Sequence, residues 1–487
     1  MRMRVWVIVV AACVLAWGSA AEEPEWSVGV ASVKITPQKP IPLAGYAART
    51  APFEGVDTDI FAKALALRDA GGHRAVLVTM DLCIMPKDVA EDVRRRIMDK
   101  GSLEEGAVVL NLSHTHSGPA VSLDTGGEGN VNPRSEGVAE YTRWLQDRLV
   151  EVAGEALGKL EPAKLSYGTG VANFVMNRRQ FTDRGVILGV NPRGLVNREV
   201  PVLKIDGEDG KTRAVLFGYA CHNTTIPSKH MNVNGDYTGY AKQYVQKNLP
   251  GVEAMFVQGC GGDANPYERR SVEDAMAHGE ELGKEVLRVV GDAKAMTAVH
   301  GPLGFAEVEA ELPLQTPPRQ TLEAIAGKKS GNDKASAQEM LHLLDKGEKL
   351  SATYKAPVVA WQLGKDLTFI GLPNEVVVGY VQDLERAVGP LRLWVAGYCN
   401  EVTGYVPTRR ILWEGGYETR GLYTGVGWFA PEVEDALVGA GKEAAVKAGR
   451  ARGRPEAQNP QAKPEARKPA GKSETRNPKS ESSPKPE

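Results

Sequence analysis

The chain has 487 residues, of which 42% are apolar and 53 are glycine, and its formal charge is −2. Residues 1–4 hold two arginines and residues 451–487 hold nine Lys or Arg against five Asp or Glu, so the body between them carries about −8. An acidic body argues against nucleic acid or an anionic membrane surface as the main partner, because both require a basic face. The apolar content excludes wholesale disorder and a fibrous repeat.

The first residues have the pattern of an export signal. Residues 1–21 combine a short cationic start, an apolar run and a stretch of small residues, which predicts a secretory signal peptide cleaved near Ala20 or Ala21. The apolar run is short for a membrane span, and no other stretch of about 20 apolar residues exists, so we predict no transmembrane segment. Residues 10–13 formally fit a lipoprotein cleavage box, but the apolar run continues beyond Cys13, which disfavours a lipid anchor. We expect an exported protein, periplasmic or secreted.

Apolar, β-branched runs alternate with helical patterns along the body. The runs lie at residues 75–80, 107–112, 214–219, 253–258, 367–370 and 391–396, and the helical patterns at 87–100, 239–248, 271–290 and 375–388. This alternation predicts an α/β fold with mixed, largely buried and partly parallel sheets layered with helices. The polar stretch 321–354 predicts a helical hairpin inserted between strands.

No firm boundary divides the body, so we expect a single large catalytic-type domain over residues 22–450. Residues 451–487 are rich in Pro, Lys, Glu, Ser and Ala and contain no aromatic or large aliphatic side chain, which predicts a disordered tail. Cys83, Cys221, Cys260 and Cys399 each lie in or at the end of an apolar run. We expect buried free thiols, although export permits disulfides.

Polar, often Gly-containing turns follow five of the predicted strands. In an open α/β sheet, ligand sites form beyond the carboxyl ends of the strands, so these turns could converge on one cleft. The turns are residues 113–119, 221–225, 259–266, 372–375 and 397–405.

The turn at residues 113–119 contains two histidines. On an extended segment His114 and His116 would face the same side and reach one cleft. His222 and Glu375 complete a His/His/carboxylate set that leaves a position open for water, as catalytic zinc requires. The alternative is that His222 is only a satisfied polar residue at a strand end.

Three cysteines offer a competing ligand set. Cys221, Cys260 and Cys399 lie in the same turns, and thiolates bind zinc well. A thiolate-rich set would form a closed structural site, and no Cys-x-x-Cys pair is present, so this alternative is the less favoured.

At these residues the chain resembles the neutral/alkaline, non-lysosomal ceramidase family, zinc amidohydrolases that split N-acyl-sphingosine into fatty acid and sphingosine. The resemblance runs from about residue 28 to residue 417. It rests on residues 29–37 (Gly-Val-Ala-Ser-Val-Lys-Ile-Thr-Pro), 43–46 (Leu-Ala-Gly-Tyr) and, most specifically, 114–119 (His-Thr-His-Ser-Gly-Pro).

The resemblance implies a zinc site. Carried over position by position, it makes His114, His222 and Glu375 zinc ligands. Residues 400–408 resemble the stretch of the family that contains a tyrosine ligand, which corresponds to Tyr405.

The resemblance also implies groups that act on the substrate. Arg178 matches the arginine of an Asn-Arg pair that faces the substrate, Tyr417 matches a second family tyrosine, and His116 would transfer protons beside the metal. The chain departs from the family at Asn265, because family ceramidases carry an essential serine there.

These residues predict a metal-assisted hydrolysis of an amide, or alternatively an ester, by zinc-activated water. Arg178, Tyr417 and Asn265 would position the substrate and stabilise the oxyanion. Asp81 and Asp263, both at strand ends, could orient a metal-bound histidine, with a turn-capping role as the alternative.

The expected partner is a small-molecule or lipid amide. Two rival hypotheses remain: a metal-binding but non-catalytic exported protein, and a hydrolase of a small non-lipid amide or ester. The sequence predicts no oligomeric state.

Overall fold

The computed structural model describes residues 25–49, 51–125, 132–328, 332–389, 392–419, 421–422 and 427–451. The predicted signal peptide and residues 452–487 of the predicted tail lie outside these ranges. No helix within them is long and apolar enough to cross a membrane.

The first sheet has the strand order β12-β10-β9-β6-β1-β3-β4-β5, with β14 paired to β6. Its strands are β1 (Trp26–Lys34), β3 (Phe61–Asp69), β4 (Arg74–Met80), β5 (Val108–Leu112), β6 (Glu161–Val171), β9 (Glu199–Gly207), β10 (Thr212–Tyr219), β12 (Glu253–Gln258) and β14 (Thr297–Val299).

Four helices cover the outer face of this sheet: α1 (Lys87–Gly101), α2 (Glu136–Gly158), α3 (Asp236–Asn248) and α4 (Val272–Gly291). Alternate strand residues divide between the two faces, as period-2 patterning requires. In β4, for example, Val76 and Val78 pack beneath the helices, whereas Leu77 packs on the inner face.

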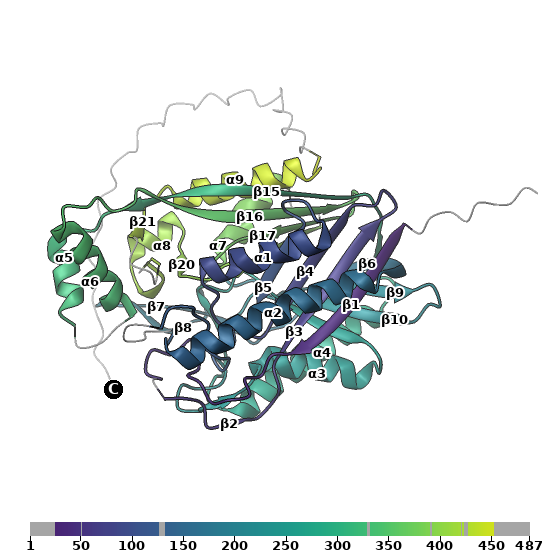
Figure 1. Cartoon of the computed structure of the whole chain (residues 1–487), viewed down its shortest axis with the longest axis horizontal. Coiled ribbons are helices and arrows are strands. Elements are labelled where there is room, and N and C mark those ends of the chain that lie inside the picture. Colours follow the sequence, from purple (N-terminus) through teal and green to yellow (C-terminus); the bar gives the residue numbers. More distant parts are fainter. Residues whose placement is uncertain are drawn as a thin grey trace, which may run out of the picture. The chain divides into compact units, whose positions relative to one another are not determined.

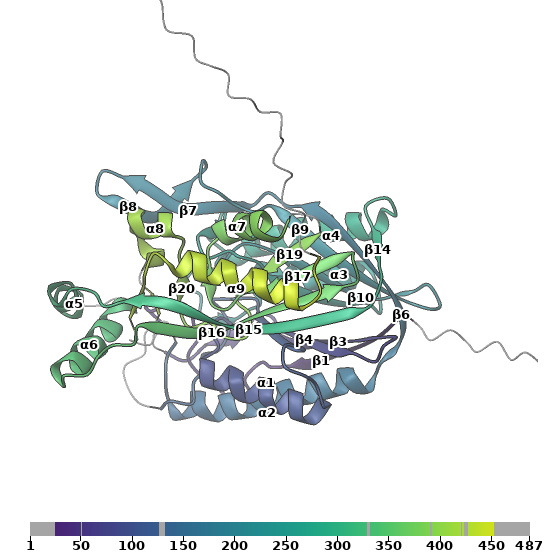
Figure 2. The same cartoon turned by 90° about the horizontal axis from the view of Figure 1, so that it is seen from above.

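The second sheet has the order β19-β17-β16-β15-β21 and packs on the inner face of the first. Its strands are β15 (Leu303–Gln315), β16 (Thr353–Leu363), β17 (Leu367–Gly371), β19 (Leu393–Ala396) and β21 (Trp428–Phe429), and α7 (Gly379–Val388) and α9 (Val433–Lys447) cover its outer face. Figure 2 shows the resulting layers, in which two stacked sheets lie between two sets of helices. The predicted α/β class is confirmed.

Between β15 and β16 the chain forms α5 (Arg319–Ala326) and α6 (Asn332–Asp345). They pack on each other through a small apolar cluster that contains Leu322, Ile325 and Met340. The predicted helical hairpin is therefore present.

Short ribbons complete the fold near the predicted turns: β13 (Ala264–Pro266) with β7 (Val175–Thr182) and β8 (Gly185–Asn191), β18 (Glu375–Val376) with β20 (Tyr405–Val406), and β2 (Gly55–Val56) with β11 (Asn232–Val233). Beside them lie α8 (Arg409–Glu414) and the 3-10 turn η1 (Tyr417–Thr419).

The helix predicted from residue 375 begins four residues later than expected. Glu375 and Val376 pair instead with Tyr405 and Val406, and this pairing places Glu375 opposite Tyr405.

Parallel pairing occurs where the site is built. The pairs β4–β5, β10–β12 and β17–β19 are parallel, and most other pairs are antiparallel. Isolated bridges then link the turns that follow these strands, including Thr115 with Asn223 and Gly259 with Ala396. The turns predicted to share one cleft are therefore neighbours.

Candidate metal centre and active site

The turn after β5 brings His114 and His116 together, but its backbone conformation differs from the extended one that the sequence predicted. The prediction of an extended segment is wrong at His114, whose φ is 64°. The backbone turns there because the His114 N–H donates to the Leu82 carbonyl and the His116 N–H to the Asn223 carbonyl. The two rings still meet, with 3.1 Å between their Nε2 atoms.

Three buried side chains from separate turns converge on one point. His114 Nε2 and His222 Nε2 lie 3.0 Å and 3.1 Å from the same oxygen, Glu375 Oε2. The three residues are at most 1% exposed. Within the described ranges, this set is one of two groups able to hold a metal ion.

Backbone carbonyls fix the orientation of both imidazoles. His114 Nδ1 lies 2.8 Å from the Cys83 oxygen and His222 Nδ1 lies 2.7 Å from the Gly261 oxygen. Because a carbonyl can only accept, each Nδ1 must donate, and the lone pair of each neutral ring is then on Nε2.

This arrangement fits a divalent cation. Two imidazole lone pairs and a carboxylate oxygen repel one another unless a positive charge lies between them. A tetrahedral zinc site with bonds of about 2.0–2.1 Å places its ligand atoms about 3.3 Å apart, close to the two distances to Glu375 Oε2. The donor set, two nitrogens and one oxygen, is also typical of zinc.

The pKa shifts of Glu375, His114 and His222 also indicate that a positive charge stabilises this group of side chains. Burial raises the pKa of Glu375, but His114 and His222 outweigh it and hold that pKa well below its ordinary value. Burial opposes the charged form of His114, yet Cys83 and Glu375 hold the pKa of His114 well above its ordinary value. Burial and the Arg178 charge lower the pKa of His222 to about 3. In the metal-free protein, a proton on His114 therefore supplies the charge between the ring and the carboxylate.

Tyr405 and Tyr417 flank the centre together with Arg178. The Tyr405 hydroxyl lies 3.3 Å from His222 Nε2, and its ring is nearly parallel to the His222 ring. The Arg178 guanidinium carbon lies 5.2 Å from the Tyr405 ring centroid and 5.6 Å from that of Tyr417, within cation–π range. Arg178 Nη1 donates to His222 Nε2 over 3.0 Å, which agrees with a lone pair on that atom.

Asn265 lies beside the same arginine. Its Oδ1 accepts from Arg178 Nη1 at 3.5 Å and from Thr224 Oγ1 at 3.3 Å. A guanidinium can only donate, so the amide oxygen faces Arg178 and the Nδ2 hydrogens remain for another acceptor. Asn265 also lines a surface cavity of about 220 Å³ together with Met176, Val190 and Tyr267.

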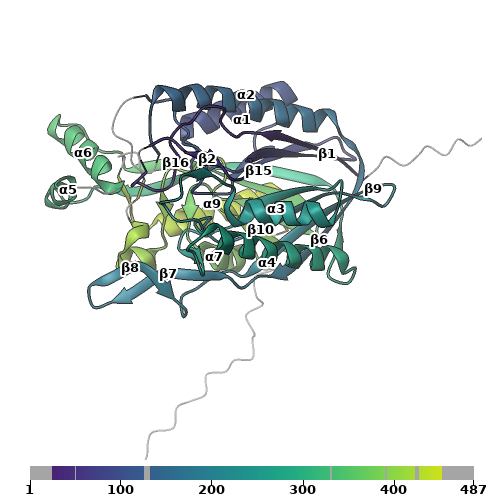
Figure 3. The ribbon, with the colours of Figure 1, turned by 90° about the horizontal axis from the view of Figure 1, so that it is seen from below.

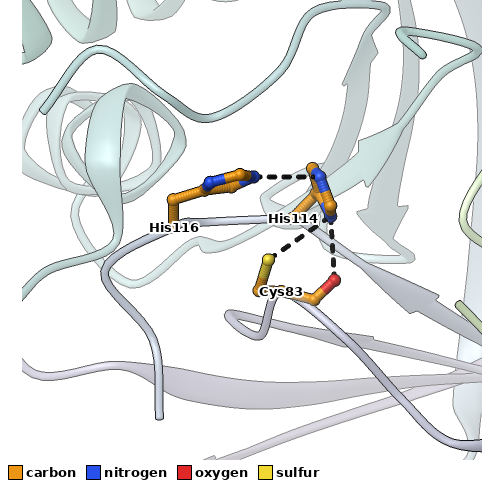
Figure 4. A group of neighbouring side chains, drawn as sticks. All are labelled: Cys83, His114 and His116. Carbon is orange, nitrogen blue, oxygen red and sulfur yellow. Dashed lines mark hydrogen bonds between the residues drawn. The ribbon is translucent and has the colours of Figure 1, made fainter. Parts of the chain in front are cut away.

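His116 lies beside His114, and the dashed line in Figure 4 joins their two Nε2 atoms. Its ring centroid is 4.8 Å from that of Tyr46, and its Nδ1 is buried without a hydrogen-bond partner within the described residues. Burial, followed by the charges of His114 and His222, holds the pKa of His116 well below its ordinary value. The ring is therefore neutral near pH 7.

The two predicted orienting aspartates bind other groups. The Asp81 carboxylate pairs with Lys242 and accepts from the Phe61 N–H. Asp263 accepts from the Val378 N–H at 2.8 Å and from Asn177 Nδ2 at 3.2 Å. Asp81 thus forms an ion pair with α3, and Asp263 accepts from the backbone of the residue before α7. The groups that contact the Nδ1 atoms of the two imidazoles are backbone carbonyls.

All four cysteines in the described ranges are free and buried. The predicted thiolate alternative of Cys221, Cys260 and Cys399 is not among the candidate metal groups of these ranges. The cysteine in such a group is Cys83, with His114 and His116. Its Sγ lies 3.7 Å from His114 Nδ1.

Sequence reasoning missed two further residues of the site. Tyr398 lies in one of the predicted turns; its hydroxyl is 3.5 Å from His222 Nδ1 and its ring 4.6 Å from that of His114. Glu418 follows Tyr417 and accepts from Arg178 Nε at 2.8 Å. Glu418 carries no motif, so only its adjacency to Tyr417 could have indicated it.

Comparisons with known proteins show which sequences and folds the chain is similar to. The sequence profile described as neutral/alkaline non-lysosomal ceramidase, N-terminal, matches residues 26–268. Neutral ceramidase B of Dictyostelium discoideum is 27% identical over 248 residues, which are 47% of this chain and 33% of that protein. Neutral ceramidase of Pseudomonas aeruginosa is 24% identical over 270 residues, 52% of this chain and 38% of that protein.

The matched part of the chain thus spans about a third of the length of these curated relatives. A crystal structure of the P. aeruginosa neutral ceramidase superimposes with a TM-score of 0.67 at 20% identity and covers 87% of this chain and 74% of that one, so the two share a fold. On these findings, the chain belongs to the neutral/alkaline non-lysosomal ceramidase family.

Proposed function

We propose that this protein is a zinc-dependent amidohydrolase that acts on N-acyl-sphingosine or a related N-acyl substrate. His114, His222 and Glu375 would hold the zinc, with Tyr405 as a further ligand. The observation that carries the proposal is the convergence of two carbonyl-oriented imidazole nitrogens on one buried carboxylate oxygen. The neutral ceramidases among its relatives support the substrate class.

Zinc in such a site acts as a Lewis acid that lowers the pKa of a water molecule towards about 7. The chain supplies the proton transfer: His116 Nε2 lies 3.1 Å from His114 Nε2, within reach of a water molecule at the centre. A neutral imidazole at this point can take a proton and return it to the departing nitrogen.

Arg178, Tyr417 and Asn265 would hold the substrate and its developing negative charge. Arg178 Nη2 is buried and has no hydrogen-bond partner within the described ranges, so it is a donor for a carbonyl oxygen. The Asn265 amide, whose oxygen accepts from Arg178, has Nδ2 hydrogens left to donate. Donors fixed in a buried site are the arrangement that stabilises an oxyanion.

The residue at position 265 favours attack by water over attack by a side chain. Family ceramidases carry a serine at this position, whereas this chain has an asparagine, which has no nucleophilic hydroxyl. The same residue supports a second candidate function, a protein that keeps the metal but has lost turnover. A hydrolase of a small non-lipid amide or ester is the third candidate.

The test compares metal content and turnover in the full chain. We expect one zinc per chain and hydrolysis of N-acyl-sphingosine. Glu375→Gln should lose the zinc. His116→Ala should keep the zinc and lose about 10²–10⁴-fold in kcat, the usual contribution of a general base.

His278→Ala is the matched control, because His278 is a similarly buried histidine that stacks on Phe174 away from the centre. A chain without stoichiometric zinc would contradict the proposed site. Zinc without hydrolysis of any amide would favour the non-catalytic protein, and cleavage of simple amides alone would favour the small substrate.

We also propose that the protein is exported, on the pattern of residues 1–21. Amino-terminal sequencing of protein recovered from outside the cytoplasm should find a start near residue 21 or 22. A chain that retains Met1 would contradict the export signal.

A further inference from the structure

The hairpin formed by β7 and β8 projects as a two-stranded ribbon. β13 pairs only with residues Val175, Met176 and Asn177 at the base of β7. Beyond that base, β7 pairs with β8 alone among the described strands. In Figures 2 and 3 the ribbon runs along one edge of the body, and α5 and α6 project farther at the same end.

The projecting part carries exposed apolar side chains. Phe181 is 60% exposed, and Ile187, Leu188 and Val190 are between 42% and 49% exposed. Phe181 pairs with Val186, whereas Ile187 pairs with Gln180, so neighbouring residues place apolar groups on both faces of the ribbon. Clustered exposure of this kind marks a surface that meets an apolar partner.

The hairpin and the seven residues after it are also basic, in contrast to the acidic body. Residues 175–198 contain five arginines and one aspartate, although two of the arginines, Arg178 and Arg179, are buried and pair with Glu418. Arg184, Arg193 and Arg198 are exposed and form no salt bridge within the described ranges. The net charge of the body disfavours an anionic partner for the protein as a whole, but this end of it attracts one.

A cavity of about 450 Å³ lies against the base of the hairpin and α8. Three arginines line it, Arg179, Arg193 and Arg410, with Glu414 as the single acidic lining residue. Arg179 is 2% exposed, and its Nε is buried without a hydrogen-bond partner within the described residues. Arg179 Nη1 and Nη2 already donate to Glu418, Glu414 and the Gly415 carbonyl, and Arg410 pairs with Glu414. Arg193 is therefore the lining arginine that has no ion-pair partner within the described ranges, and its guanidinium can bind an anionic group of phosphate size.

We propose that this hairpin docks the protein on a lipid surface that contains anionic phospholipid. The apolar side chains enter the boundary between headgroups and acyl chains, and the arginine-lined cavity receives a phosphate headgroup. The adjoining residue on β7, Arg178, belongs to the candidate active site, so docking would bring that site to the membrane. The inference deepens the proposed function, since it selects a lipid substrate over a small amide, but binding can be measured without turnover.

The experiment is co-sedimentation of the full chain with phosphatidylcholine vesicles, with and without phosphatidylglycerol. The wild-type protein should bind the vesicles that contain phosphatidylglycerol. The double variant Phe181→Ser/Leu188→Ser should bind at least about tenfold less, because two buried side chains are lost from the bilayer. Val56→Ser, which removes a similarly exposed aliphatic side chain from β2, should bind as wild type.

A second pair of variants tests the charge. Arg193→Gln should weaken binding about fivefold on the anionic vesicles, the effect of one basic residue near such a surface. Lys164→Gln removes an equal charge from an exposed site on β6 and should leave binding unchanged.

Equal sedimentation of the wild type and the Phe181→Ser/Leu188→Ser variant would overturn the docking surface. So would a wild-type dimer that this variant abolishes without vesicles, since the hairpin would then bind a second copy. Vesicle binding without any amide hydrolysis would leave the docking surface standing and refute the catalytic proposal. Hydrolysis of micellar N-acyl-sphingosine without vesicle binding would support the catalytic proposal and overturn the docking surface.

Discussion

Replacing Glu418 by glutamine removes the charge that holds two buried arginines. Glu418 Oε1 accepts from Arg178 Nε at 2.8 Å and Oε2 accepts from Arg179 Nη1 at 2.6 Å. All three side chains are at most 5% exposed. The amide keeps one oxygen as an acceptor and turns its NH₂ group towards the other guanidinium, which has no acceptor to offer. Breaking a buried ion pair in this way costs about 3–5 kcal/mol.

That cost converts into a small but measurable change in melting temperature. With an unfolding entropy of about 2.1 cal/mol/K per residue, a body of about 430 residues loses roughly 3–5 °C in Tm. Differential scanning calorimetry of the zinc-loaded protein measures the shift. Turnover should fall as well, because Glu418 fixes the position of Arg178 beside His222.

Glu414→Gln is the matched control for this experiment. Glu414 also accepts from Arg179, at 3.1 Å, but its side chain is 21% exposed and does not contact Arg178. Loss of a partly exposed pair costs only about 0–1 kcal/mol. The reasoning fails if Glu418→Gln melts within a degree of the control and keeps full activity.

Three further outcomes are expected. Burial raises the pKa of Glu401 to about 7, so the contribution of its protonated carboxyl to stability is present below about pH 4.5 and is lost as the pH rises through 7. In denaturant titrations between about pH 5 and 8, the wild type should therefore lose about 3 kcal/mol of unfolding free energy. Glu401→Gln should abolish this loss. Gly45→Ala would place a Cβ 2.5 Å from His116 Cγ, so turnover should fall about 10²-fold with zinc retained. Gly72→Ala is the control, because Gly72 has a similar positive φ but open space around it, and this variant should remain active. Equal loss in both variants would contradict a role for the position of His116. Asn265→Ser should lower kcat about 10²–10³-fold if the amide serves the oxyanion, whereas ceramide cleavage appearing only in that variant would show that the native substrate lies elsewhere.

The sequence predicted the elements whose pattern is strong. The runs at 75–80 and 253–258 are β4 and β12 almost to the residue, because buried strands in the middle of a sheet must be apolar throughout. The pattern also predicted that the turns after these strands share one cleft, since parallel neighbours end at the same edge.

The parts that the sequence could not give depend on tertiary contacts. The helical pattern from residue 375 is real, but pairing with β20 converts its first two residues into a strand and so places Glu375 at the centre. The carbonyls of Cys83 and Gly261 orient the two histidines. Every residue has a backbone carbonyl, so the amino-acid sequence does not indicate which carbonyls take this role. The order of the two stacked sheets likewise follows from packing between distant segments.

Strand β7 contributes one residue to each of the two sites proposed for this protein, the metal centre and the surface cavity. Arg178 contacts His222 on one side, whereas the next residue, Arg179, lines the surface cavity. A single carboxylate, Glu418, accepts from both guanidiniums. Since Glu418 cannot move towards one arginine without lengthening its bond to the other, the position of Arg178 depends on how Arg179 is held. An anionic headgroup that binds Arg179 would compete with Glu418 for the positive charge of that arginine. The hydrogen bond between Glu418 and Arg178 would then become stronger. Under these two proposals, lipid docking and substrate positioning would be coupled through one buried residue. Glu418 should then affect turnover more than its single hydrogen bond to Arg178 suggests.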